Sequence, residues 1–361
     1  MSPGLRMAVL SLEPETSASW YVRILTPLAA LRQRIELLLG ACRNGARTSI
    51  DLDIIDKADL VLIQRLFPAR ATWPVIQSII DSGKRIVYEA EDFLLEPDRT
   101  DPDYLRARLC RPYIADLLRA AHAVIVPSAA LRQAYSAYSS SIQVLPELLH
   151  ASLWAQPIRE PSTTPTIGFL GQASDVANLA LIEDALVDVS TRLGSRVRFV
   201  FIGCVTPTLA ALPGVRVLPE PLDYPARARV MHEAGLDIAL APLRDTAFNR
   251  CKGRLRWLEY SAAGAAGIYS DLPGIRESVS PGRTGLLVGS APEAWASALE
   301  QLALDPERRA TIARTAQNEV LSRHTVEAGA LGLAETLEAV AKNPYPSAAS
   351  AGSIPGSALE S

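Results

Sequence analysis

The sequence predicts an α/β protein of two domains, each built around a parallel β-sheet. Apolar runs of strand length alternate with helical stretches along the chain, which is the pattern of parallel strands buried on both faces. Residues 151–165 interrupt this pattern with three prolines and small polar residues, so we expect a linker there. A length of 361 residues also fits two domains.

The first domain is expected over residues 1–150. Its predicted strands are Met7–Leu12, Leu60–Gln64, Arg85–Glu89 and Ala123–Val126. The segment Pro27–Leu39 has apolar side chains at helical spacing and is followed by Gly40, which predicts a helix. Arg32 and Arg34 lie within this segment, and Arg43 and Arg47 follow it. Two interpretations stay open: a solvated helix on the core, or a basic amphipathic surface that contacts a membrane.

The second domain is expected over residues 166–325. Its predicted strands are Thr166–Leu170, Val197–Ile202, Val215–Leu218, Asp237–Ala241, Gly267–Tyr269 and Gly285–Val288. Its predicted helices lie near residues 176–192, 224–234, 251–263, 292–303 and 306–321. Residues 326–342 predict a C-terminal helix that packs back on the first domain. Residues 343–361 contain mostly Pro, Ser, Gly and Ala, so we expect a disordered tail.

Composition and charge exclude several classes of protein. The chain carries 36 basic and 39 acidic side chains, a net charge of −3, so nucleic acid is not an expected partner. Its four cysteines lie far apart and form no C-x-x-C pair, which indicates neither a disulfide framework nor a thiolate zinc site. No run approaches the roughly 18 apolar residues of a spanning helix. We therefore expect a cytoplasmic protein, with the inner face of the membrane as a second location.

The densest group of candidate residues lies at 241–264, where a predicted strand ends, a loop follows, and a helix begins near Cys251. Asn249 and Lys252 belong to this loop, and Lys252 at a helix start is suited to binding a diphosphate. Glu259 follows seven residues later, on roughly the same helix face. It is placed to bind a sugar hydroxyl. The alternative is that Lys252 is solvated and Glu259 is an ordinary exposed acid.

A second candidate site follows the strand Thr166–Leu170. Gly171 lets a phosphate approach the backbone, and the helix start after Gln172 offers N–H donors. An ordinary strand-to-helix turn also needs a glycine, so this signal is weak by itself.

Several ordered motifs resemble the nucleotide-sugar domain of retaining GT-B glycosyltransferases of the family 4 type. They are PLRDTAFNRCK at 242–252, LEYSAAG at 258–264, SDLPGIRE at 270–277 and TGLLV at 284–288. The first half resembles the acceptor domain of these enzymes more loosely. Its matching segments are LVLIQR at 60–65, RIVYEAEDF at 85–93, AAHAVIVPSAAL at 120–131 and VLPE at 144–147. The resemblance implies a GT-B fold, with two Rossmann-like domains facing each other across a cleft.

The resemblance also implies roles for individual residues. Glu259 would bind the donor ribose, Lys252 would face the diphosphate, and Gly171 and Gln172 would lie against the phosphates. The loop Pro219–Tyr224 would border the base. The remaining implied site residues are Asn249 and Tyr224 for the donor, Arg23 and Arg65 for the acceptor, and Glu91 and Asp92 near the reacting carbon.

The chain departs from the family pattern at three places. Cys251 stands where the family usually has a glutamate, eight residues before Glu259. EPETSASWY at 13–21 replaces a glycine-rich loop, and Glu91-Asp92 replaces a common His-Asp pair. The roles of Glu91 and Asp92 therefore stay open between catalysis and helix-start carboxylates.

The resemblance implies a retaining glycosyltransferase that moves a sugar from a nucleotide-diphosphate sugar, UDP- or GDP-linked, to a hydroxyl. No cofactor and no metal are expected, because the four histidines are scattered. The expected acceptor is a glycan, glycolipid or small molecule, in surface polysaccharide, glycolipid or secondary-metabolite synthesis. The main alternative is a catalytically silent GT-B module that binds a nucleotide or a protein partner. A sugar-nucleotide isomerase is a third possibility, but the sequence contains no set of acid and base residues that supports it.

Overall fold

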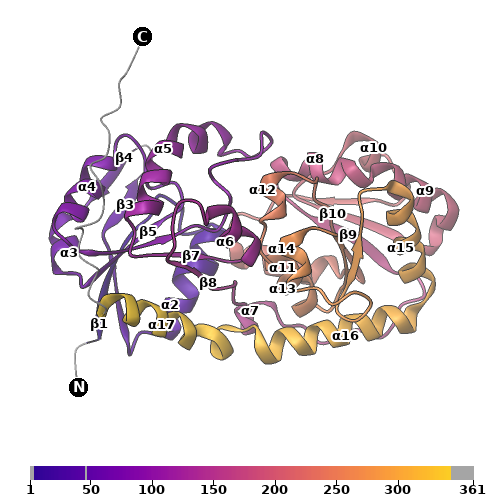
Figure 1. The fold of residues 1–361 in the computed structure, drawn as a ribbon. Coiled ribbons are helices and arrows are strands. Elements are labelled where there is room, and N and C mark those ends of the chain that lie inside the picture. The colour runs from indigo at the N-terminus through magenta and orange to yellow at the C-terminus, as the bar shows by residue number, and fades with distance from the viewer. Residues whose placement is uncertain (1–3, 45–46, 343–361) are drawn as a thin grey trace, which may run out of the picture.

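The computed structural model describes residues 4–44 and 47–342, and the predicted tail at 343–361 lies outside them. Two α/β domains lie next to each other, the N-terminal one in indigo and purple and the C-terminal one in pink and orange (Figure 1). Within the described residues, each domain contains one six-stranded parallel sheet. Buried side chains form separate cores on the two faces of each sheet.

The N-terminal sheet has the strand order β2-β1-β5-β6-β7-β8. Its strands are β1 (Leu5–Leu10), β2 (Ile35–Leu39), β5 (Leu60–Gln64), β6 (Arg85–Glu89), β7 (Ala123–Val126) and β8 (Ile142–Val144). An antiparallel hairpin, β3 (Ala41–Asn44) with β4 (Arg47–Ile50), follows β2. The helical elements are α1 (Ala18–Trp20), the π-helical turn η1 (Tyr21–Leu25), α2 (Thr26–Ala30), α3 (Leu52–Lys57), α4 (Trp73–Asp81), α5 (Tyr104–Ala120) and α6 (Ala129–Tyr135).

The C-terminal sheet has the strand order β11-β10-β9-β12-β13-β14. Its strands are β9 (Thr166–Leu170), β10 (Arg198–Ile202), β11 (Arg216–Leu218), β12 (Ile238–Ala241), β13 (Ala266–Ser270) and β14 (Leu286–Val288). The helical elements between β8 and β10 are α7 (Ala151–Trp154), η2 (Ala173–Asp175), α8 (Val176–Leu179), η3 (Ala180–Ile182), α9 (Glu183–Leu193) and η4 (Gly194–Arg196). The later helices are α10 (Pro207–Ala210), α11 (Tyr224–Ala234), α12 (Ala247–Arg250), α13 (Leu255–Ala262), α14 (Pro273–Arg276), α15 (Pro292–Leu304), α16 (Pro306–Arg323) and α17 (Val326–Lys342).

Both sheets reverse their winding direction at a defined point. In the N-terminal sheet the chain winds outward from β1 to β2, and β5 then pairs on the other side of β1. The C-terminal sheet does the same between β9 and β12. Ligands of open α/β sheets bind beyond the carboxyl ends of the strands at such reversals. The segments that follow β1, β5, β9 and β12 are therefore the first places to look for a site.

One predicted helix is wrong. Instead of a helix over Pro27–Leu39, the chain forms the short α2, a turn, and the edge strand β2. The run Ile35–Leu39 pairs in parallel with β1, whose open edge supplies hydrogen bonds that a sequence pattern does not reveal. The predicted membrane contact therefore loses the amphipathic helix on which it rested. Among the described residues, no helix combines the length and the apolar character needed to cross a membrane.

The last helix of the described chain returns to the first domain. Yellow α16 and α17 run in succession from the C-terminal domain back beneath the N-terminal one (Figure 1). Val326, Ala330, Ala334 and Leu337 of α17 are buried in the same core as β1 and α2. Arg34 and Glu338 form an ion pair of 2.8 Å across this contact. The N-terminal core thus includes residues from both ends of the chain.

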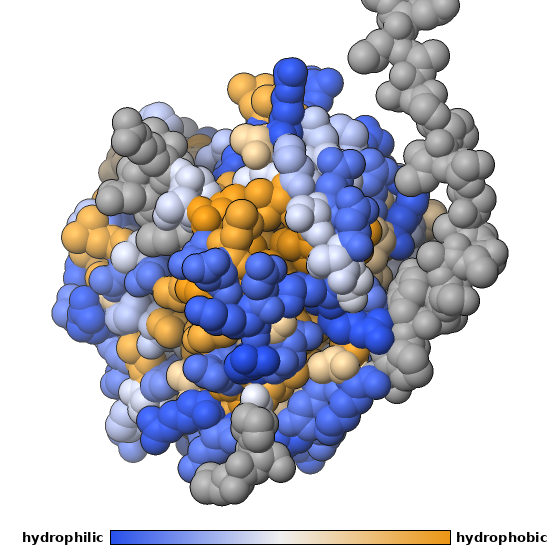
Figure 2. Space-filling model, turned by 90° about the vertical axis from the view of Figure 1, so that its left-hand side faces the viewer, coloured by the Kyte–Doolittle hydropathy of each residue, from blue (hydrophilic) through white to orange (hydrophobic). Residues whose placement is uncertain are grey.

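The end of the N-terminal domain that faces away from its partner domain carries the β3–β4 hairpin and α3 (Figure 1). A shallow groove there is lined by residues that include Leu39, Ile50 and Leu52. Figure 2 shows hydrophobic side chains gathered on this end and surrounded by hydrophilic ones. The polar cleft described next lies on the opposite side of the domain.

Candidate functional site

A cleft of about 560 Å³ lies between the domains and is lined by both. The segments that follow β1, β5, β6, β9 and β12 all contribute side chains to it. The cleft therefore lies where the two winding reversals predict a ligand. Every candidate site residue from the sequence lines it except Glu259, which lies directly behind its wall, between two cleft-lining arginines.

Lys252 comes from a short turn between α12 and α13, and not from the first turn of a helix as predicted. The Cys251 and Lys252 N–H groups donate to the Phe248 and Asn249 carbonyls at 3.2 Å, which ends α12 in a tight turn, and the next helix begins only at Leu255. A side chain at Gly253 would meet a Glu147 carboxylate oxygen at 2.1 Å, so the glycine lets the turn pass this N-domain residue. The turn is thus shaped by the opposite domain.

The Lys252 ammonium is held by groups of the N-terminal wall. Its Nζ lies 2.9 Å from Asp92 Oδ1 and 4.4 Å from the centre of the Phe248 ring. Burial opposes the charge, but Asp92 raises the pKa of Lys252 above its ordinary value, so the side chain is a cation. Phe248 and Cys251 of the same segment are buried in the N-terminal core. The loop that carries Lys252 is therefore anchored in the other domain.

Glu259 is fully buried, which excludes the interpretation of an ordinary exposed acid. Its Oε2 accepts a 2.8 Å hydrogen bond from Arg256, and its Oε1 lies 3.6 Å from Arg227 Nε. Burial raises the pKa of Glu259, while Arg256 acts against that shift. Oε1 and the Tyr224 hydroxyl, both buried, make no hydrogen bond among the described residues, and the nearby Glu259 adds to the effect of burial in raising the pKa of Tyr224. Each of these two oxygens behind the cleft wall therefore has the capacity for a further hydrogen bond.

Gly171 and Gln172 occupy the turn after β9. A Cβ at Gly171 would meet the Phe169 ring at 2.4 Å, so packing alone explains this glycine. The Gln172 side chain donates to Glu220 Oε1 at 3.1 Å, and the Gln172 N–H donates to Asp175 at 2.9 Å. Asn249 lines the cleft, but its Nδ2 donates to the Arg244 carbonyl at 2.9 Å. Its amide thus stabilises the loop.

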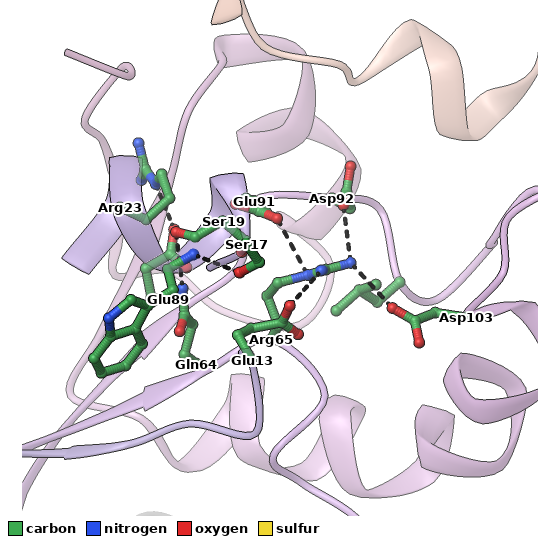
Figure 3. Close-up of polar contacts among 12 residues, drawn as sticks. Glu13, Ser17, Ser19, Arg23, Gln64, Arg65, Glu89, Glu91, Asp92 and Asp103 are labelled. Carbon is green, nitrogen blue, oxygen red and sulfur yellow. Dashed lines mark hydrogen bonds and ion pairs between the residues drawn. The ribbon is translucent and has the colours of Figure 1, made fainter. Parts of the chain in front are cut away.

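Arg65 is the centre of a carboxylate cluster on the N-terminal wall (Figure 3). Its guanidinium lies 3.2 Å from each of Glu13, Glu91 and Asp92, and 3.7 Å from Asp103. Glu13 follows the carboxyl end of β1, Arg65 that of β5, and Glu91 and Asp92 that of β6, and these three strands are neighbours in the sheet. The parallel order of the strands therefore assembles the cluster.

The backbone of Arg65 is strained. Its φ of 44° places it in the left-handed region, alone among the described residues other than glycine. Such a conformation costs about 1–3 kcal/mol and persists where the surroundings enforce it. The buried Tyr88 hydroxyl donates to the Arg65 carbonyl at 2.9 Å, and the Arg65 N–H donates to the Glu89 carbonyl at 2.9 Å. These bonds hold the guanidinium in the cleft wall.

Arg23 forms a different pair. Its Nε donates to Glu89 Oε1 at 2.7 Å and its Nη1 to the Leu145 carbonyl at 2.8 Å, and both side chains of the ion pair are almost fully buried. This arrangement indicates that Arg23 stabilises the base of the N-terminal wall. Of the two predicted acceptor residues, Arg65 is the better placed to contact an acceptor.

Glu91 and Asp92 are not at a helix start, because the next helix, α5, begins at Tyr104. Lys252 and Arg65 lower the pKa of Asp92 against the effect of burial. Burial raises the pKa of Glu91 from 4.5 to about 8, and the nearby Asp92, Glu89 and Glu13 add to the shift despite Arg65. Two adjacent carboxyl groups therefore differ in charge near neutral pH.

This difference predicts a pH-dependent stability that Glu91→Gln removes. Between pH 4.5 and about 8 the folded protein holds a proton on Glu91 that the unfolded chain releases. The free energy of unfolding therefore falls as pH rises through this window, and the fall is smaller in the variant. Urea midpoints of both proteins at pH 5.5, 7 and 8.5 measure it. A wild-type minus variant difference that stays constant with pH contradicts the prediction.

Interdomain contacts surround the cleft. The Glu277 carboxylate accepts 2.8 Å hydrogen bonds from the N–H groups of Ala129 and Ala130 at the start of α6. Ser128 Oγ donates to the Cys251 carbonyl at 3.0 Å, and Arg244 pairs with Asp98 at 2.6 Å. These contacts between the two domains hold them together around the cleft.

Glu277→Ala is expected to populate a more open arrangement. It removes two charge-assisted bonds at an exposed contact, which together contribute about 1 kcal/mol. Small-angle X-ray scattering should give a larger radius of gyration for the variant. Arg276→Ala, which removes an exposed pair with Asp271 inside one domain, is the matched control. Equal radii for all three proteins contradict the prediction.

Sequence reasoning missed several residues of this site. Arg256 precedes Glu259 by three residues, a helical spacing that predicts contact, but it is not among the predicted site residues. Glu13 lies in the segment that departs from the family pattern. Glu277 ends the motif at 270–277, but the sequence assigns it no role, and Arg227 and Asp98 give no local signal, because their partners are distant in the sequence.

The described residues contain no group of three or more His, Cys, Asp or Glu side chains arranged to hold a metal ion. His122, His232 and His324 have lowered pKa values, in each case mainly because of burial.

Known structures share this architecture. Sucrose-phosphate synthase from Thermosynechococcus elongatus superposes with a TM-score of 0.67 at 15% identity, covering 92% of this chain and 98% of that one. HepE of Anabaena, in complex with UDP and glucose, gives 0.66 at 16% identity, covering 93% and 100%. A glycosyltransferase from Rickettsia africae gives 0.64 at 13%, covering 95% and 100%. The chain has the GT-B fold.

The GT-B assignment agrees with the sequence comparison. A family model described as glycosyl transferase-like matches residues 222–334, which contain Lys252, Glu259 and Arg227, the residue that pairs with Glu259. No curated protein sequence matches the chain significantly. At these identities the solved structures establish the fold, and the glycosyl transferase-like segment lies in the second GT-B domain.

Proposed function

We propose that this protein is a retaining glycosyltransferase that uses a nucleotide-diphosphate sugar and requires no metal. The observation that carries the proposal is the buried Glu259 directly behind the cleft wall, whose Oε1 accepts no hydrogen bond within the described part of the chain and whose neighbour Tyr224 has a hydroxyl that also lacks one. A ribose with two neighbouring hydroxyl groups supplies the donors that these oxygens lack. HepE, which has the same fold, was solved with UDP-glucose.

The diphosphate of the donor would lie between Glu259 and the N-terminal wall. Lys252, Arg227 and Arg256 are the cations of the C-terminal wall there. Gly171 and Gln172 line the same space, while their own N–H groups donate to the Ile202 carbonyl and to Asp175. As the bond from the sugar to the diphosphate breaks, negative charge grows on the departing phosphate. Lys252 stabilises that charge more in the transition state than in the ground state, which accelerates the reaction.

The acceptor hydroxyl would approach from the wall formed by Arg65, Glu91 and Asp92. In a retaining reaction it attacks from the face that the diphosphate leaves. The acceptor oxygen bonds to the anomeric carbon, the phosphate oxygen takes the bonding electron pair, and the hydroxyl proton passes to that phosphate. Closure of the domains excludes water that would otherwise hydrolyse the donor.

The second candidate is a silent module that binds nucleotide without transferring sugar. Cys251, at the place of a family glutamate, favours it, because this buried thiol supplies no carboxylate. Burial raises the pKa of Cys251 to about 11, so it is a neutral thiol.

Thermal unfolding with UDP, GDP, ADP, dTDP and CMP tests both candidates. A nucleotide present at 100 times its Kd stabilises the folded protein by about 2.7 kcal/mol. The matching nucleotide sugars are then tested for release of the nucleoside diphosphate in the presence of an acceptor mixture. Stabilisation with turnover supports the transferase, and stabilisation without turnover supports the silent module. No stabilisation by any nucleotide contradicts both.

A further inference from the structure

The two walls of the cleft differ in charge. Among the described residues that line it, the C-terminal wall has three carboxylates and three cations. The N-terminal wall has seven carboxylates and two guanidinium groups. One of these, Arg23, is already paired with Glu89. The wall that faces an acceptor therefore has a large excess of negative charge.

Two of the seven carboxylates are used elsewhere. Asp98 pairs with Arg244, and Glu147 accepts from the Arg254 N–H at 3.3 Å. The remaining five are Glu13, Glu91, Asp92, Asp101 and Asp103. They share Arg65 and Lys252, Asp103 also lies 3.8 Å from Arg106 Nη1, and Asp101 has no ion pair among the described residues. If Lys252 turns to a donor diphosphate, only Arg65 and Arg106 are left to balance five carboxyl groups.

A separate observation on the same wall points to a ligand. Ser19 lines the cleft and is only 9% exposed, and its Oγ has no hydrogen-bond partner within the described part of the chain. Its carbonyl accepts from Gln64 Nε2 at 3.4 Å, which fixes the residue beside the Glu89–Arg23 pair (Figure 3). A buried hydroxyl without a protein partner is stabilised when a bound molecule supplies one, and a ligand on this wall can do so.

We propose that the acceptor carries a protonated amine beside its hydroxyl groups, as an amino sugar or an aminocyclitol does, and that the Arg65 carboxylate cluster binds this ammonium. The inference rests on the proposed glycosyltransferase function. An ammonium has three N–H donors and no acceptor, which matches a wall of carboxylate oxygens. A phosphorylated or carboxylated acceptor would meet like charge. A divalent cation is disfavoured by the absence of a metal-binding arrangement in the described residues.

The cluster should release a proton when the ammonium binds. Glu91 is mostly protonated at pH 7, because its pKa is raised to about 8. The charged groups that face it are Arg65, Arg23, Glu13, Glu89 and Asp92. An additional cation favours the carboxylate form. Calorimetry in two buffers of different ionisation enthalpy measures this proton release.

The test uses the full chain saturated with the nucleoside diphosphate that it binds. Glucosamine and 2-deoxystreptamine are titrated at pH 7 against glucose, N-acetylglucosamine and glucose 6-phosphate. We expect at least one amine to bind about tenfold more tightly than glucose, the effect of one charge-assisted hydrogen bond. Glucose 6-phosphate should bind more weakly than glucose. If neither amine binds more tightly than glucose, including no binding at all, the proposal is overturned.

Variants assign the preference to the cluster. Glu13→Gln and Asp103→Asn should reduce the preference for the amine to less than about threefold while the nucleotide Kd is unchanged. Asp116→Asn removes an exposed carboxylate on α5 and should leave the preference intact. An amine preference that survives in both cluster variants overturns the assignment. Nucleotide binding is measured separately. If the wild-type protein binds no nucleotide, that result contradicts the proposed function instead.

Discussion

Glu259→Gln is expected to raise the Kd for the nucleoside diphosphate about 100-fold, because a charge-assisted hydrogen bond contributes about 1.5–3 kcal/mol. The amide keeps the shape of the side chain but loses the negative charge that Arg256 and Arg227 surround. One oxygen position becomes an N–H donor, which cannot accept from a ribose hydroxyl. Calorimetric titration measures the change.

The same substitution also leaves two arginines without their carboxylate. Removing one partner of a buried ion pair costs about 3–5 kcal/mol, so the variant should unfold at a lower temperature. Binding is therefore measured where circular dichroism shows a folded variant. Glu233→Gln, an exposed position on α11, is the matched control and should behave as wild type. A folded Glu259→Gln protein with wild-type affinity would show that the ribose does not bind there.

Lys252→Met is expected to lower kcat for sugar transfer by about 10²–10³-fold, the effect of losing one preorganised group that stabilises transition-state charge. Met preserves the apolar stem that contacts Phe248 and removes the ammonium. Stability should change less, since the ion pair with Asp92 is one-third exposed on the lysine side. Initial rates at saturating donor measure kcat.

Arg250→Ala is the matched control for this loop. Arg250 lies two residues earlier, pairs with the exposed Asp245, and does not line the cleft. Its kcat should equal that of wild type. If Lys252→Met retains full kcat but binds the donor more weakly, Lys252 contributes only uniform binding and the proposed catalytic role is wrong.

The central strands of both sheets could be predicted from the sequence, because short, continuous apolar runs are typical of parallel strands that are buried on both faces. The strands β5, β6, β7 and β9 begin and end at the predicted residues. It failed at β2, where the same leucines fit a helix or a strand until the open edge of β1 is known. Lys252 and Glu259 could be predicted as site residues because they lie in one segment, and Arg65, Glu91 and Asp92 because their segments resemble the family. That these three form one cluster with Glu13 and Asp103 could not be predicted, because its members meet only through strand order.

The helix α17 has a consequence for how the chain acquires its structure during synthesis. The N-terminal core that contains Met7, Trp20 and Ile24 is completed by Ala334 and Leu337, more than 300 residues later. A ribosome makes the domain between them first. While the second domain is translated, only the segment that contains Trp20, Ile24 and Leu28 covers this apolar face of the first sheet, and the face is sealed when α17 emerges. A nascent chain halted after α16 should expose this face to chaperones, whereas one halted after α17 should not.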